Sequence, residues 1–141
     1  ALELCAAEPP TISEPAPNLS ATSTTATALE GILARVAANA DTRAAVIADE
    51  LGLPIVALGE HASSLAALGS IVGDAGQRAR ALLPMGAIRG FSIADENSAT
   101  ITSWPITAAD ATLMILTLTV GPGPADETLR LAALEAASAV A

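Results

Sequence analysis

The chain has 141 residues, the size of one domain, which is enough to bury a core without disulfides or a structural metal. It carries 15 acids against 6 bases, all of them arginines, and its net charge is −9. Such a surface repels phosphate backbones and anionic lipid, so neither nucleic acid nor a membrane surface is expected as a partner. No apolar run reaches the roughly 20 residues of a membrane-spanning helix.

Residues 1–26 are rich in Pro, Ser, Thr, Ala and Glu, which is typical of an extended tail or linker. Such a segment is either a plain disordered tail or a tail that docks on a partner. Cys5 is the only cysteine and lies here, so a disulfide within the chain is excluded. The first residues show no basic segment followed by an apolar one, so no secretion signal is recognised and a cytoplasmic protein is expected.

A folded domain is expected over residues 27–141, and its first element is predicted to be a helix. Thr27 and Glu30 have the spacing of a capping box, in which the hydroxyl and the carboxylate each satisfy a free backbone amide. Apolar residues then recur at helical spacing over residues 29–37. The helix is predicted to end at residues 39–41.

Two short apolar runs, residues 43–48 and 53–58, predict a pair of strands joined by a tight turn. Gly52 lies between them and can adopt the positive φ that such turns require. Pro54 cannot donate to a strand ladder, so it is expected at the start of its strand or on a sheet edge. The acids of the turn are interpreted as solvated groups.

A long helix is predicted over residues 62–83. Gly69, Gly73 and Gly76 interrupt it, and small residues on one helical face let another backbone approach closely. The remaining elements predicted from the pattern are strands at residues 87–94, 99–106 and 112–120, a turn at 95–98, and a last helix at 125–140.

Candidate catalytic and ligand-binding residues are few. His61 is the only histidine, and a surface or helix-capping role is favoured over that of a catalytic base. A metal site needs clustered His, Cys or carboxylates, and a Walker loop needs a lysine, which this chain lacks. Trp104-Pro105 is interpreted either as a buried or edge-protecting pair or as a ligand-stacking site. We therefore expect no catalytic residue, no metal, no cofactor and no enzymatic activity.

The order α-β-β-α-β-β-β-α predicts an α+β fold in which helices cover both faces of an antiparallel sheet. An exposed edge strand is a template for another chain, and in a two-fold dimer the same strand of each subunit can extend the sheet. Protein–protein contact is therefore the favoured class of function.

The stretch VIADELGLPIV, residues 46–56, resembles the first hairpin of the roadblock/LC7 family, where an acid and a glycine precede a Leu-x-Ile pattern. Ala66-Ala67-Leu68 and the apolar strand at 112–120, followed by a helix, are also similar to the family. The resemblance spans about residues 27–140 and carries no catalytic signature. It implies a five-stranded antiparallel sheet of the profilin-like superfold, with the middle helix on one face and the two terminal helices on the other.

The resemblance also implies a homodimer, or a heterodimer with a paralogous roadblock subunit. In the family, the third strands pair across a two-fold axis and the middle helices pack together. Carried over to this chain, the implied dimer interface consists of Leu65, Leu68, Gly69, Val72, Gly73, Gly76, Ile88, Gly90, Phe91 and Ile93.

Family members serve as scaffolds and regulators of small Ras-like GTPases or as light chains in motor assemblies. The resemblance therefore implies a GTPase-binding module, or a structural subunit of a larger assembly that docks through its tail. A small-molecule sensor with a closed apolar pocket is a third class, because a fold does not fix a function. The lysine-free acidic surface and the low aromatic content depart from the family, so no particular GTPase contact is implied.

Overall fold

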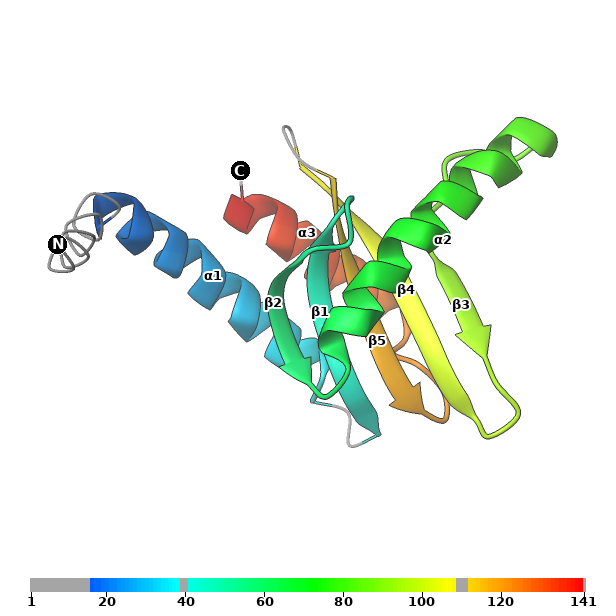
Figure 1. The fold of residues 1–141 in the computed structure, drawn as a ribbon, viewed down its shortest axis with the longest axis horizontal. Helices are drawn as coiled ribbons and strands as arrows, with labels where there is room; N and C mark the ends of the chain where they lie inside the picture. The colour runs from blue at the N-terminus through cyan, green and yellow to red at the C-terminus, as the bar shows by residue number, and fades with distance from the viewer. Residues whose placement is uncertain (1–15, 39–40, 109–111, 141) are drawn as a thin grey trace, which may run out of the picture.

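The computed structural model describes residues 16–38, 41–108 and 112–140, which form an antiparallel sheet with helices on both faces (Figure 1). The sheet has five strands in the order β2-β1-β5-β4-β3. The predicted fold class and order of elements are confirmed. The elements are α1 (Ala16–Val36), β1 (Thr42–Asp49), β2 (Pro54–Gly59), α2 (Ala62–Leu82), β3 (Phe91–Ala94), β4 (Ala99–Thr107), β5 (Thr112–Val120) and α3 (Asp126–Val140).

The turn between β1 and β2 is built from the residues that predicted it. Asp49 Oδ1 accepts hydrogen bonds from the backbone amides of Leu51 and Leu53, each at 2.9 Å. Gly52 has a φ of +85° and packs on α2, where an added Cβ would lie 3.1 Å from the Cα of Ala67. Pro54 begins β2, which is an edge strand. The hairpin prediction is therefore confirmed, and the turn packs against the next helix.

The turn between β3 and β4 uses the same device. Asp95 Oδ1 accepts hydrogen bonds from the amides of Asn97 and Ala99, each at 2.8 Å, and Ser98 has a φ of 70°. A carboxylate that satisfies two turn amides holds the backbone in place without help from the core. The turn predicted at residues 95–98 is confirmed.

The predicted start of the first helix is wrong. α1 begins at Ala16, so Thr27 and Glu30 lie inside the helix and do not cap it. Pro17 misled the prediction, because proline is compatible with the first turn of a helix, where its missing amide has no partner to lose. Part of the segment expected to be a tail is therefore helical, whereas its first 15 residues, with Cys5, lie outside the described residues.

The third strand is shorter than predicted. β3 begins at Phe91, and Ile88, Arg89 and Gly90 precede it as irregular backbone. Gly90 has a φ of +155°, and a Cβ there would lie 2.2 Å from the carbonyl oxygen of Ser103. Only glycine fits so close an approach, and its conformation ends the pairing with β4.

The core is divided by the sheet into two layers of unequal size. Under α1 and α3 lie large buried side chains such as Leu29, Leu33, Ile47 and Ile115. Under α2 the buried layer is smaller and is built around Val46, Leu65 and Leu116. The α2 layer is completed by side chains that remain partly exposed, namely Phe91, Ile101, Met114 and Leu118.

Candidate interaction surface

One helix is too narrow to cover the α2 face of this sheet. Neighbouring strands lie about 4.8 Å apart, so five strands span roughly 19 Å between the outer two. A helix with its side chains is about 10–12 Å wide. α2 packs on β1, β2 and β5, and it makes no extensive contact with β3 or β4. The half of this face over β3 and β4 is therefore left without a covering helix (Figure 1).

An apolar row crosses the uncovered half of the α2 face. Ile93 of β3 pairs in register with Ile101 of β4, which pairs with Leu118 of β5. Ile93 is 47% exposed, and Ile101 and Leu118 are half-buried. Val120, two residues along β5, is also exposed. Adjacent apolar side chains in such a row are characteristic of a surface that another chain covers.

The flank of α2 beside this row is apolar as well. Leu65 is buried, and Leu68 and Val72 follow at positions i+3 and i+7, so the three lie along one side of the helix. The other flank carries Ser70 and Gln77, which line a separate cavity where β1 ends and β5 begins. The apolar flank therefore lies on the side of α2 away from that cavity, and with the apolar row it makes a second group of partly exposed apolar side chains on this face. We call this the open surface, defined by Leu68, Val72, Phe91, Ile93, Ile101 and Leu118.

The helix glycines pack on their own chain. A Cβ added to Gly69 would lie 3.1 Å from Leu116 Cδ1, and one added to Gly76 would lie 3.4 Å from Ile88 Cγ1. At Gly73 the nearest side-chain atom is Met114 Cε at 3.9 Å. The glycines thus allow α2 to approach β5 and the segment before β3. Their place in a dimer contact stays a prediction.

The β3 edge differs from the β2 edge. β2 contacts both α1 and α2, so helices flank it on both faces. β3 pairs with β4 and has no extensive contact with any helix. Of the residues expected on this edge, Phe91 and Ile93 lie in β3 and point to the open surface, whereas Ile88 and Gly90 precede the strand. The β3 edge is therefore the more accessible place for another strand to pair.

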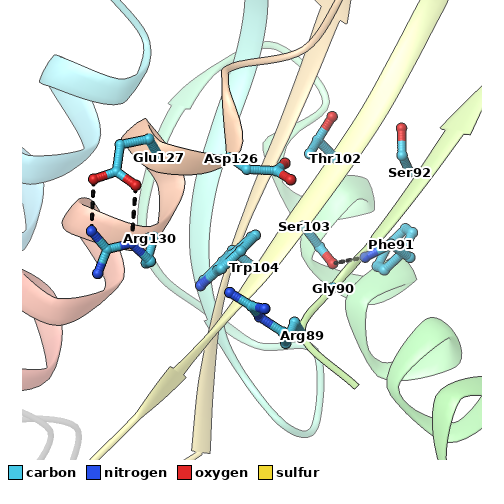
Figure 2. Close-up of a pocket in the computed structure, with 10 residues that line it drawn as sticks. All are labelled: Arg89, Gly90, Phe91, Ser92, Thr102, Ser103, Trp104, Asp126, Glu127 and Arg130. Atoms are coloured by element: carbon cyan, nitrogen blue, oxygen red, sulfur yellow. Dashed lines mark hydrogen bonds and ion pairs between the residues drawn. The ribbon is translucent and has the colours of Figure 1, made fainter. Parts of the chain in front are cut away.

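Trp104 lies on the other face of the sheet and is half-buried against the core beneath α1 and α3. β4 is an inner strand, so Trp104 protects no sheet edge. The guanidinium of Arg89 lies over its ring, 5.4 Å from the centroid (Figure 2). The sequence did not suggest this contact, because nothing in the spacing of the two residues indicates that the segment before β3 lies beside β4.

Glu127 and Arg130 lie beside Trp104, in the first turns of α3 (Figure 2). Arg130 donates two hydrogen bonds to the Glu127 carboxylate, from Nε at 3.1 Å and from Nη2 at 2.6 Å. These hydrogen bonds lower the pKa of Glu127 and raise that of Arg130, and the attraction of the opposite charges adds to both shifts. Both groups are exposed, so the pair contributes little to stability.

Other candidate residues are placed without a chemical role. His61 is the exposed N-cap residue of α2, with a φ of 67°, and its side chain makes no capping hydrogen bond. Within residues 16–38, 41–108 and 112–140, no three His, Cys, Asp or Glu side chains gather closely enough to hold a metal ion. None of the described helices has the length and apolar character needed to cross a membrane.

Solved structures of the roadblock/LC7 fold share this arrangement of one helix on one face of the sheet and two on the other. The chain matches a roadblock/LC7 domain from Streptomyces avermitilis with a TM-score of 0.54 and 21% identity, over 78% of this chain and 89% of that one. It matches MglB from Myxococcus xanthus with a TM-score of 0.56 and 14% identity, over 82% and 86% of the two chains. It also matches the gliding protein MglB from Thermus thermophilus with a TM-score of 0.59 and 17% identity, over 84% of this chain and 90% of that one.

No protein-family profile and no curated protein matches the sequence. At these identities the solved structures establish the fold. They confirm the resemblance to the roadblock/LC7 family at that level, and the partner and the assembly are matters for proposal.

Proposed function

We propose that this chain is a dimeric interaction module without catalytic activity, which binds or regulates a small Ras-like GTPase. The open surface carries the proposal. One α2 covers only part of its face, and the α2 of a second copy, related by a two-fold axis, would cover the remaining half. The fold shared with MglB and with a roadblock/LC7 domain supports the same interpretation.

The second copy is the best occupant for geometric reasons. Pairing of two β3 edges would continue the sheet across the two-fold axis and satisfy backbone groups at the edge. The same rotation would bring two apolar α2 flanks together over the β3–β4 half of each sheet. A heterodimer with a paralogous subunit would use the same surface.

Acidic substitutions on the open surface test the dimer. We expect Leu68→Asp and Ile93→Asp each to convert the chain to a monomer, because each would bury a carboxylate in an apolar contact. Leu134→Asp is the matched control, since Leu134 is 57% exposed on α3 at the opposite face. The measurement is molar mass by light scattering, with circular dichroism to verify folding. A folded Ile93→Asp variant that keeps the wild-type dimer mass would refute the β3 contact.

The GTPase part of the proposal has its own test. The dimer is mixed with small Ras-like GTPases from the same organism, and both binding and nucleotide turnover are measured. We expect one of them to bind at micromolar concentration or below and to change its turnover rate, and the monomeric variants to lose this effect. If no such GTPase binds, the GTPase role fails even where the dimer is found.

A further inference from the structure

A cavity of about 480 Å³ opens on the α1/α3 face of the sheet, between β3 and the first turn of α3 (Figure 2). Its size lies within the range of about 300–1,000 Å³ that is usual for small-molecule sites. It lies on the face opposite the open surface, where α3 covers β4 but not β3. The residues that matter here are Arg89, Thr102, Trp104 and Asp126, together with the Glu127–Arg130 pair.

The charges that line this cavity are not all balanced. Glu127 and Arg130 neutralise each other through their two hydrogen bonds. Arg89 and Asp126 form no ion pair with any residue in the described part of the chain, and Arg89 makes only the contact with Trp104. Arg89 comes from the segment before β3 and Asp126 from the start of α3, so one cationic and one anionic group line different walls of the cavity.

The Thr102 hydroxyl adds a third polar group to the cavity wall. Thr102 is only 9% exposed and lines the cavity. Its hydroxyl makes no hydrogen bond with any residue among those described. The hydroxyl oxygen is not among the fully buried atoms that lack a partner, so it is open to water or to a ligand in the cavity. Trp104 provides the apolar part of the cavity wall.

We propose that this cavity binds a small zwitterion that carries a carboxylate and an ammonium group, of which free α-amino acids are the simplest class. The carboxylate lies against Arg89, the ammonium group against Asp126, and the apolar portion against the Trp104 ring. A zwitterion has no net charge, so the acidic protein does not repel it, whereas phosphate and nucleotides would be repelled. Gly90 and Phe91 line the cavity and also belong to the implied dimer interface, so the cavity lies beside the proposed strand pairing.

The test uses the fluorescence of the full chain. Trp104 is the only tryptophan and the chain has no tyrosine, so the emission comes from a residue in the wall of this cavity. The probes are the free L-amino acids, each compared with its amide, which lacks the carboxylate, and its N-acetyl form, which lacks the ammonium group. Dipeptides are tested as a second set of probes. If they bind more tightly than free amino acids, the carboxylate and the ammonium group come from peptide termini.

We expect at least one amino acid or dipeptide to shift the emission in a saturable way. Its amide and N-acetyl forms, and the Asp126→Asn variant, should bind at least about ten-fold more weakly, which corresponds to roughly 1.4 kcal/mol. Asp74→Asn is the matched control, because Asp74 is an exposed acid on α2, and it should leave binding unchanged. Absence of a saturable shift up to millimolar concentration, or equal binding of the capped forms, overturns the proposal. Calorimetry verifies any shift.

Discussion

The two faces of the sheet are formed by the same strands but are closed to different extents. On the α1/α3 face, two helices bury fourteen residues in one continuous layer. On the α2 face, one helix buries only seven. We call the α1/α3 face the closed face. The Arg35–Glu135 ion pair joins α1 to α3 at its rim.

This difference separates folding from assembly. The α1/α3 face holds the larger buried cluster, whereas the α2 face leaves an apolar row at the β3 edge uncovered. Surfaces of this kind on folded domains are usually interaction sites. We therefore expect stability to depend chiefly on the α1/α3 face and association on the α2 face.

Truncation of one leucine on each face gives the largest expected contrast. Leu33→Ala removes a side chain with 0% exposure from the closed face and is expected to lower the free energy of unfolding by about 2–5 kcal/mol. Leu118→Ala, at a half-buried position on the α2 face, is expected to lower it by only roughly 1 kcal/mol in a monomer.

Urea denaturation measures both truncations, in the monomeric Ile93→Asp background so that association does not contribute. Equal losses at the two positions would mean that the α2 face is closed within one chain. The distinction between the faces would then be wrong.

The closed face has a polar exception that gives the next prediction. Thr117 is fully buried on β5, and its hydroxyl has no hydrogen-bond partner among the described residues. Thr117→Val should therefore raise the stability by about 1 kcal/mol, because it removes an unsatisfied buried group and keeps the shape. Thr119 is the control: its hydroxyl donates to the Gly121 carbonyl at 3.1 Å, so Thr119→Val should lower stability. We expect the Tm to rise in Thr117→Val and to fall in Thr119→Val.

Elements with local causes could be predicted from the sequence. The β1–β2 and β3–β4 turns follow from Asp49, Gly52 and Asp95, whose side chains or backbone form each turn within a few residues. β5 occupies the residues predicted for it, because alternating large apolar side chains between firm breakers leave little ambiguity. The start of α1 was missed because Pro17 was read as a residue that excludes a helix. Proline disrupts the interior of a helix but is tolerated in its first turn, where Pro17 lies.

The candidate sites depend on contacts that sequence spacing does not encode. The carried-over residues Phe91 and Ile93 do lie on the open surface, but Ile101 and Leu118 were missed because strand register decides which side chains form one row. Arg89, Trp104 and Asp126 come together from three separate elements. The sequence does not indicate which charged side chains will line the same cavity, so this cavity could be recognised only in the folded structure.

The smallest predicted effect concerns the Glu127–Arg130 pair at the rim of the closed face. Arg130 lowers the pKa of Glu127 below its ordinary value of 4.5. A carboxylate with a lowered folded-state pKa adds stability above the pKa of the unfolded chain, and that stability is lost as the pH falls through the lower folded value. Arg130→Gln should therefore return the Glu127 pKa toward 4.5, as measured by NMR titration.

The stability of the Arg130→Gln variant should be slightly lower than that of the wild type at neutral pH and equal to it in acid below the folded pKa of Glu127. The difference is small because both side chains are exposed and water screens their attraction. Glu127→Gln, which removes the titrating group, should abolish this part of the pH dependence. A large, pH-independent loss in Arg130→Gln would instead mean that the apolar stem of Arg130 packs on Trp104 and helps to close this rim.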